Sequence, residues 1–393
     1  LEYYGWSKGD IAKWTREHCP DLLPRSVFKE GKKKDGDSDA QQGSNQVADM
    51  LALFEEQHPV VFRNEMDEAY VQFPLDVRKV IMKCESSRFE KYLHKLYWEK
   101  KKSLINTENL SKIVKLIAAQ AEYGDQKFSL HNRVALHEND FWYDLGDSKA
   151  VRCKVDSWEI VEDLPVLFHN YKHQEVQVLP ATIGGSVERI FDHIYIKNAD
   201  HQLLYCDWLI SSYVPGIPHP IMVLFGEKGA SKSTTLRFAR RLIDPSKVDL
   251  LNLPSHDEIV QQLSHHYAAF YDNVNRVSQE MSDALCRAVT GAGSSKRRLF
   301  TDDDDVICLY RRVIGINGIN NVVQNSDLLD RSILIELERI PGKDRKTEDE
   351  INFAFEKDRL IILGGVFDFL AKARTVFAGL TLSTFHRMAD FAK

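Results

Sequence analysis

A glycine-rich stretch followed by a lysine and a serine is the part of this sequence best suited to chemistry. Residues 223–245 read VLFGEKGASKSTTLRFARRLIDP, close to the pattern G-x-x-x-x-G-K-[ST], with Ser231 where the second glycine is usual. An apolar run at 221–225 precedes the stretch, and an amphipathic helical pattern follows it. The N–H groups of such a loop and the N-terminus of the next helix form a positive concavity that binds phosphates. The context of strand, loop and helix therefore predicts a phosphate-binding loop.

The side chains at the end of the loop have distinct expected contacts. Lys232 would reach the β- and γ-phosphate oxygens of a nucleotide, Ser233 the Mg²⁺ ion and Thr234 the α-phosphate. The other predicted nucleotide-binding positions in the loop are Gly226, Glu227, Lys228, Gly229, Ala230 and Ser231. The second glycine is usual because backbone there lies close to phosphate, so a serine preserves the loop if its φ angle is negative. The alternative is a chance glycine-rich turn before a helix.

A carboxylate follows a second apolar strand. The strand at 267–271 ends in Asp272, a position from which a carboxylate holds the Mg²⁺ shell in phosphoryl-transfer enzymes. The alternative is a buried strand with a cap residue, and the loop upstream favours the metal role. Asn273 stands where a glutamate is usual, and an amide can orient a water molecule but cannot take its proton. Ser233 and Asp272 are therefore the predicted metal ligands, and the general base is left unassigned.

Two more polar residues lie beside apolar strands. Asn317 ends a third strand and is a candidate for positioning the attacking water, with Asn320 and Asn321 as competitors. A strand-end asparagine is also an ordinary turn residue. Arg331 precedes a fourth strand, where an arginine could enter a neighbouring subunit's site and stabilise charge on the transferring phosphoryl group. An ion pair with Asp330 is the alternative.

Four segments in this order resemble the ring-forming helicase ATPases: GEKGASKST, FYDN, INGIN and DLLDRS. The small residue before Lys232 resembles the loop of the minichromosome maintenance helicases, and ALCRAVTGAGSSKRRLF at 284–300 resembles the extra motif of superfamily three helicases. The closest likeness is to the replicative helicases of this kind in phages and mobile genetic elements, including the helicase part of primase-helicases. It covers about residues 195–360.

The resemblance implies ATP and Mg²⁺ as cofactors, a homo-oligomeric ring, most simply a hexamer, and single-stranded or forked DNA as partner. A primase or polymerase is a further partner that it leaves open. It gives catalytic roles to Lys232, Asp272, Asn273, Asn317 and Arg331, and a nucleotide-sensing role in a helical lid to Arg345.

The same resemblance implies a DNA-gripping hairpin. Lys296, Arg297 and Arg298 would lie on or near it and bind DNA. Its turn, TDDDDV, is acidic, unlike the basic tip of many helicases. Those aspartates could instead contact a neighbouring subunit or make the turn more soluble.

The elements that position these residues are predicted to form an α/β P-loop NTPase fold with a parallel sheet, preceded by an α+β N-terminal domain. The resemblance implies the AAA+ type and a helical lid. The predicted boundaries are a short helical segment at 1–26, a disordered linker at 27–46, a collar domain at 47–195, an ATPase core at 196–340 and the lid at 341–393. Hydrophobic periodicity inside the collar predicts helices at 46–57, 86–102 and 109–123, a hairpin at 59–74, and short strands at 128–145, 150–161 and 175–180.

Composition limits the classes of partner. The 393 residues are 43% apolar and 28% charged with a net charge of −6, so a nucleic acid must meet a local basic patch. No apolar run is long enough to span a membrane. Six scattered cysteines without a C-x-x-C pair, and no signal peptide, favour a reduced, intracellular setting. The resemblance to helicases of phages and mobile elements implies the cytoplasm of a bacterial or archaeal host, with a phage or plasmid origin. His265 and His266 have no carboxylate or cysteine at ligand spacing, so no metal is expected there.

Three functions are compatible with these patterns. The favoured one is an ATP-dependent DNA helicase that hydrolyses ATP at subunit interfaces and moves along single-stranded DNA during replication. The alternative is an ATP-gated DNA-binding initiator or loader without unwinding activity, which Asn273 favours because weak hydrolysis suits a switch. A metabolic P-loop kinase is disfavoured by the candidate arginine finger and by the lack of a small-substrate signature.

Overall fold

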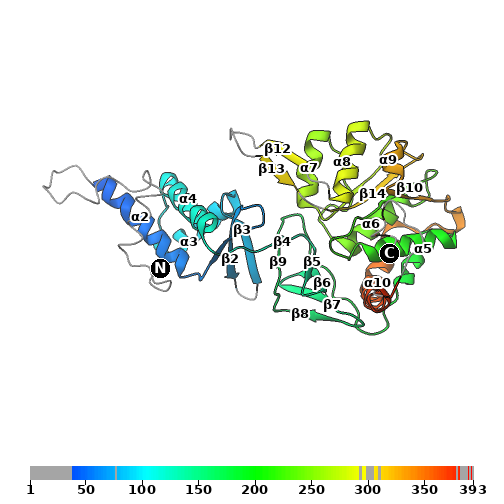
Figure 1. Cartoon of the computed structure of the whole chain (residues 1–393), viewed down its shortest axis with the longest axis horizontal. Coiled ribbons are helices and arrows are strands. Elements are labelled where there is room, and N and C mark those ends of the chain that lie inside the picture. The colour runs from blue at the N-terminus through cyan, green and yellow to red at the C-terminus, as the bar shows by residue number, and fades with distance from the viewer. Residues whose placement is uncertain are drawn as a thin grey trace. The chain divides into compact units, whose positions relative to one another are not determined.

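The chain divides into two compact units in the computed structural model (Figure 1). The described residues are 38–75, 78–291, 294–297, 305–308, 311–377, 379–380, 388 and 391. The first unit holds the described residues up to Leu75 together with Val80–Phe128. The second unit holds Ser129 onward, with the short connecting segment before Val80.

The first unit packs helices and a three-stranded sheet around its own core. Its elements are α2 (Ser38–Glu55), β1 (Val60–Arg63), β2 (Ala69–Leu75), β3 (Arg78–Lys83), α3 (Ser87–Lys101) and α4 (Thr107–Tyr123). The sheet order is β1-β2-β3, and β1 pairs antiparallel with β2, which confirms the predicted hairpin. Ser86 and Asn106 cap α3 and α4 by accepting backbone N–H groups. Phe73 is fully buried and its ring lies 4.6 Å from that of Tyr92.

The second unit begins with short strands. The antiparallel sheet β5-β6-β7-β8 forms from consecutive hairpins, and a small parallel pair joins β4 to β9. The strands are β4 (Leu130–His131), β5 (Val134–His137), β6 (Asp140–Gly146), β7 (Lys149–Cys153), β8 (Trp158–Val161) and β9 (Leu167–Phe168). The predicted strand at 175–180 is wrong, because this segment pairs with no other strand. Gln177 there donates its backbone N–H to Leu145 O instead.

A four-stranded parallel sheet in the order β11-β14-β10-β15 is the centre of the second unit. Its strands are β10 (Ile221–Phe225), β11 (Ala268–Tyr271), β14 (Val313–Gly318) and β15 (Ser332–Glu336). All of β11 and β14 is buried, as expected for a parallel sheet covered on both faces. An isolated parallel bridge joins Leu251 to Tyr271.

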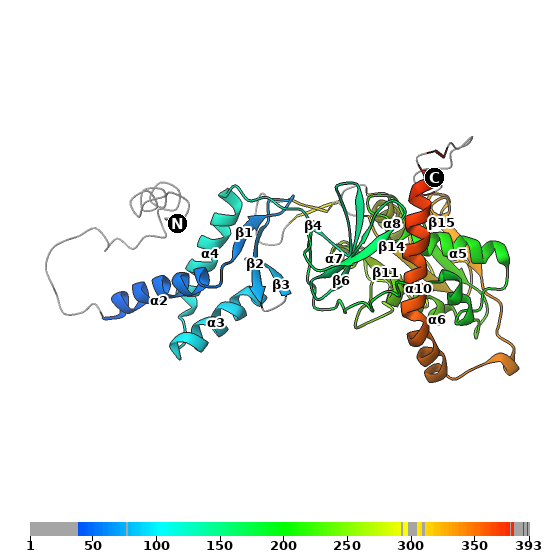
Figure 2. The same cartoon turned by 90° about the horizontal axis from the view of Figure 1, so that it is seen from below.

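Helices cover this sheet, and a two-stranded hairpin follows α8 in the chain. They are η4 (Val187–Asp192), α5 (Ala199–Ser211), α6 (Lys232–Ile243), α7 (His256–His265), α8 (Gln279–Thr290), α9 (Ser326–Leu329), η5 (Gly342–Asp344) and α10 (Glu348–Phe377). The hairpin pairs β12 (Ser294–Arg297) with β13 (Asp305–Cys308) in antiparallel fashion. Figure 2 shows α10 beside α5 and α6, which it contacts.

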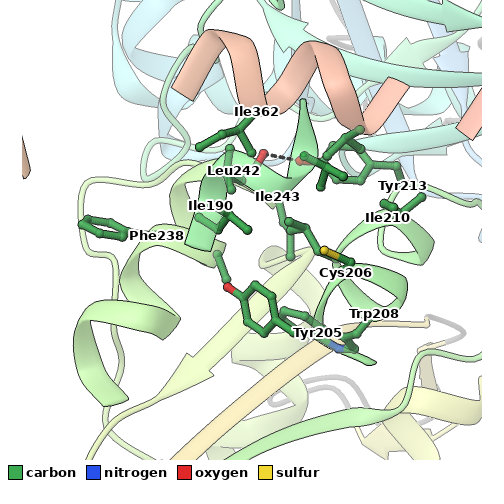
Figure 3. Packing of buried hydrophobic residues seen from close by; sticks show 14 of the residues in the cluster. Ile190, Tyr205, Cys206, Trp208, Ile210, Tyr213, Phe238, Leu242, Ile243 and Ile362 are labelled. Atoms are coloured by element: carbon green, nitrogen blue, oxygen red, sulfur yellow. Dashed lines mark hydrogen bonds between the residues drawn. The ribbon is translucent and has the colours of Figure 1, made fainter. Parts of the chain in front are cut away.

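One apolar cluster joins α5, α6 and α10. Figure 3 shows Tyr205, Trp208 and Tyr213 gathered with Leu242 and Ile362, all fully or almost fully buried. Tyr213 Oη donates to Leu242 O at 2.7 Å, so the one polar atom of this ring is satisfied inside the core. The core therefore fixes α6, the helix that follows the glycine-rich loop.

Two predicted boundaries differ from the structure. The linker prediction at 27–46 fails where it is described, since 38–46 are helical; the segment 1–26 lies outside the described residues. The division near 195 is replaced by one at 128, because buried side chains bond residues 129–195 to α6. The segment predicted as a helical lid contains the helix α10, which packs within the second unit's main core; its action as a lid stays a prediction.

Candidate functional site

The glycine-rich loop leaves the carboxyl end of β10 through three left-handed positions. Gly226 has φ 140°, Gly229 φ 84° and Ser231 φ 60°. A Cβ on Gly226 would lie 2.2 Å from Leu337 O, so only glycine fits there. Ser231 caps α6 without a side-chain bond to the helix. The expectation of a negative φ at Ser231 is therefore wrong: serine here adopts the conformation for which glycine is the usual choice.

Lys232 is folded onto the loop that precedes it. Its Nζ donates to Gly226 O at 2.6 Å and to Glu227 O at 2.8 Å. Burial lowers the pKa of Lys232, and Asp272 opposes that shift. The ammonium is thus held among the loop carbonyls, inside the turn that the sequence predicts to surround phosphate. Thr234 lies in the first turn of α6, half-buried.

Ser233, Asp272 and Asn317 form one hydrogen-bonded cluster. Ser233 Oγ donates to Asp272 Oδ1 at 2.8 Å, and Asn317 Nδ2 donates to the same oxygen at 2.7 Å. Asn317 Oδ1 accepts the backbone N–H of Asn273 at 2.8 Å. These residues meet because β14 lies between β10 and β11, so the carboxyl ends of all three strands share one edge. Asn317 is only 2% exposed, and both ends of its amide are used.

The cluster matches the donor chemistry of Mg²⁺. A hydroxyl and a carboxylate are hard oxygen ligands, and Mg²⁺ is commonly bound by one or two such groups together with substrate phosphates. No group of three His, Cys, Asp or Glu side chains within the described ranges could hold a metal ion by itself. Ser233 and Asp272 therefore fit a metal that arrives with a nucleotide.

Asn273 follows Asp272 in a left-handed conformation, with φ 53°. Asparagine is among the few residues that adopt this region readily. Its side chain is exposed at the strand end. The bond from its backbone N–H to Asn317 fixes this corner of the site, although the side-chain amide cannot serve as a base.

Two arginines beyond β15 lie beside the loop. A Cβ on Gly229 would be 3.1 Å from Arg345 Nη2 and 3.9 Å from Arg339 Cγ, and Ile340 donates its N–H to Gly229 O at 3.2 Å. The structure thus brings the predicted Arg345 to the loop. Arg339 was missed by sequence reasoning. Its position follows from the strand order: β15 is parallel to β10, so residues after the carboxyl end of β15 lie beside the loop that follows β10.

Arg331 faces its own chain. Its Nη1 lies 2.5 Å from Asp327 Oδ2 and donates to Asp327 O at 2.9 Å, and Cys286 Sγ lies 3.9 Å away. The side chain is 14% exposed. Burial alone would lower the pKa of Arg331, but the contact with Asp327 outweighs it and raises that pKa above its usual value. The ion pair observed is with Asp327, whereas the sequence suggested Asp330. Action of Arg331 on a neighbouring subunit stays a prediction.

The predicted DNA-gripping segment is partly described. Lys296 and Arg297 lie on β12, opposite Val306 and Asp305 of β13. This confirms a two-stranded hairpin. Arg298 and the turn residues 301–304, of which 302–304 are acidic, lie outside the described residues.

The second unit is therefore a mixed α/β body with a glycine-rich loop at the carboxyl edge of a parallel sheet. The model of one family, described as "Actinomycete integrative conjugative element replication protein", matches residues 187–393, more than half of the chain. The chain belongs to this family, and its function lies in the replication of a mobile element. This confirms the broader part of the resemblance seen in the sequence.

Other comparisons add less. No curated protein matches the chain. Three solved apo structures of the NrS-1 C-terminal region align with TM-scores of 0.44, 0.45 and 0.42 at 10%, 11% and 12% identity. They cover 81%, 82% and 82% of this chain, and 68%, 69% and 68% of theirs. Likeness of this degree establishes neither a shared fold nor a shared activity. In the part of the chain that is described, no helix has the length and apolar character needed to cross a bilayer.

Proposed function

We propose that this replication protein is an ATP-dependent DNA helicase, which hydrolyses ATP with Mg²⁺ and moves along single-stranded DNA as a homo-hexameric ring. The observation that carries the proposal is the cluster of Ser233, Asp272 and Asn317 beside the Lys232 loop. The order β15-β10-β14-β11, with the loop after β10, supports a P-loop core of AAA+ type.

Each residue of the site has a role that follows from its contacts. The loop N–H groups and Lys232 would bind the phosphates, with the ammonium exchanging its bonds to Gly226 O and Glu227 O for phosphate oxygens. Asp272 and Ser233 would hold the metal, which when bound stabilises charge on the phosphate oxygens. Asn317 orients Asp272 through the 2.7 Å bond and ties the end of β11 to β14.

Arg345 and Arg339 lie where they could add positive charge beside the loop. Arg331 would act in a neighbouring protomer's site only after leaving Asp327. In such a ring the hairpin β12–β13 is the candidate DNA-contacting element, through Lys296, Arg297 and Arg298.

The second candidate is an ATP-gated initiator or loader that binds DNA without unwinding it. Two observations favour it: Asn273 replaces a carboxylate, and Arg331 is engaged within its own chain. Both would slow hydrolysis, as expected of a switch.

A strand-displacement assay separates the two. The wild-type chain should release a labelled strand from forked DNA with ATP and Mg²⁺, on forks with either a 5′ or a 3′ loading tail. Lys232→Ala should release none, and the charge-matched Lys357→Ala, changed at an exposed position on α10, should behave as wild type. ATP-dependent DNA binding with no displacement on either fork would establish the loader instead.

A further inference from the structure

Five aromatic rings form a continuous stack in the second unit, apart from the phosphate loop. The members of this histidine–tyrosine stack are His169, Tyr171, His173, His265 and His266. Tyr171 is at its centre, with ring centroids 4.9 Å from His169, 5.7 Å from His173 and 4.9 Å from His265. His173 and His266 are 3.8 Å apart. The first two Tyr171 contacts are near-parallel, at 22° and 14°.

The backbone around the stack is held by side-chain amides. Asn132 Nδ2 donates to His265 O at 3.0 Å, and Gln174 Nε2 donates to Asn132 Oδ1 at 3.0 Å. Gln174 Oε1 in turn accepts the N–H of Tyr171 at 3.0 Å. The segment after β9 and the end of α7 are thus fixed relative to each other, and the rings are ordered in advance.

The inner end of the stack is anchored and uncharged. His266 Nδ1 lies 3.0 Å from Arg240 Nη2, and Arg240 pairs with the buried Asp244 at 2.9 Å. Burial lowers the pKa of His173 to about 4 and that of His266 to about 3. Both rings are therefore neutral near pH 7, and the stacked pair carries no like-charge repulsion.

The outer end of the stack faces solvent and has cations beside it. His265 is exposed, and His169 and Tyr171 are half-buried. Lys172 is exposed between two stack residues, and exposed Lys247 donates its backbone N–H to His173 O. The one exposed acid in the segment 169–175 is Glu175.

Arg312 connects this surface to the hairpin. Its Nε donates to Leu263 O at 2.6 Å and its Nη2 to Ser264 O at 3.4 Å, directly before His265. Its backbone N–H bonds Ala288 O near the end of α8, the helix that leads into β12.

We propose that the histidine–tyrosine stack is a second contact site for single-stranded DNA, on which bases stack while the exposed Lys172 meets the backbone. Ordered aromatic rings bordered by cations are the combination that binds single strands without reading their sequence. The proposal rests on the proposed function for its partner, single-stranded DNA, but it needs no ATP hydrolysis.

The test compares a fluorescent oligo-dT with an abasic strand of the same length and charge. His265→Ala and Tyr171→Leu should each weaken oligo-dT binding about five- to tenfold. Binding of the abasic strand and the salt slope of oligo-dT binding should stay unchanged, because the lost contact is to bases and not to phosphates. His256→Ala, changed at the exposed other end of α7, is the matched control and should bind both strands as wild type does.

Two results would overturn the proposal: unchanged oligo-dT affinity in a folded His265→Ala chain, or an equal loss on the abasic strand. His265 is exposed, so this variant keeps the test decisive even if Tyr171→Leu fails to fold. The same comparison in a Lys232→Ala background makes the readout independent of ATP turnover. If the proposed helicase activity is wrong, the wild type will show no strand displacement. If the stacking proposal is wrong, chains with and without His265→Ala will bind oligo-dT with equal affinity.

Discussion

The two ends of helix α6 are built in opposite ways. At its N-terminal end, Ser231 makes no side-chain cap, and Lys232 bonds only to loop carbonyls nearby in sequence. At its C-terminal end, Tyr143 donates to Leu242 O at 3.1 Å and to Ile243 O at 3.0 Å, with both partners buried. The end where we propose that phosphate binds is tied to a distant segment through Ser233, which donates to Asp272, whereas the other end is fixed by buried side chains such as Tyr143.

A buried ion network strengthens the fixed end. Asp244 accepts from Arg133 and Arg240, each at 2.9 Å, and all three side chains are at most 1% exposed. Burial raises the pKa of Asp244, but the guanidiniums of Arg240 and Arg133 outweigh it and hold that pKa below its usual value. Arg359 of α10 adds a bond to Arg241 O at 2.8 Å. This buried network holds the C-terminal end of α6 in place. The position of the loop before Lys232 is thereby fixed without any network side chain entering the loop.

Breaking the fixed end should have the largest effect on stability. Asp244→Ala leaves two buried arginines without their carboxylate, and we expect a loss of about 3–5 kcal/mol in the free energy of unfolding. Urea denaturation followed by circular dichroism measures it. Asp200→Ala, at the exposed first turn of α5, should change the free energy by less than about 1 kcal/mol. Equal losses in the two variants would contradict the contrast between the ends of α6.

The next largest effect is expected on ATP turnover, if Arg331 of a neighbouring protomer completes the site at the N-terminal end of α6. If Arg331 acts in trans, Arg331→Ala should lower ATP turnover at least about a hundredfold, since such arginines contribute strongly to phosphoryl transfer. ATP binding should be retained, and mixing with Lys232→Ala chains should restore part of the turnover. Loss of stability alone, with normal turnover, would instead assign Arg331 to its intrachain pair with Asp327.

Changes in the β12–β13 hairpin should have a smaller effect, on DNA binding, and should leave both ends of α6 unaltered. Changing Lys296, Arg297 and Arg298 together to glutamine should weaken DNA binding and flatten its salt dependence by about one unit of slope per lost phosphate contact. ATP turnover without DNA should not change. Fluorescence anisotropy across a salt series measures the slope, and an unaltered slope would count against DNA contact by the hairpin.

The smallest effect concerns the serine in the loop. Ser231→Gly should raise the free energy of unfolding by about 1 kcal/mol, because glycine adopts φ 60° without the strain that a Cβ brings. Turnover should be unchanged or higher. Denaturation of both proteins measures the difference, and destabilisation by glycine would show that the Ser231 side chain supports the loop.

The sequence was most informative where local patterns determine structure. Apolar runs ending in Asp272 and Asn317 were readable as buried strands, and parallel strands bring such ends to one edge. The tie between Arg133 and Asp244 was not readable, because it joins residues 111 apart in sequence. The domain boundary failed for the same reason. The φ angle of Ser231 was also inaccessible, since serine carries no signal for a left-handed turn.

The central claim is that the loop around Lys232 binds a nucleoside triphosphate and turns it over. ATP hydrolysis by purified wild-type, Lys232→Ala and Lys357→Ala chains, with and without Mg²⁺, tests it most directly. The account predicts Mg²⁺-dependent turnover in the wild type and in Lys357→Ala, and a fall of at least about a hundredfold in Lys232→Ala at unchanged thermal stability. Turnover by Lys232→Ala equal to that of the wild type would contradict it.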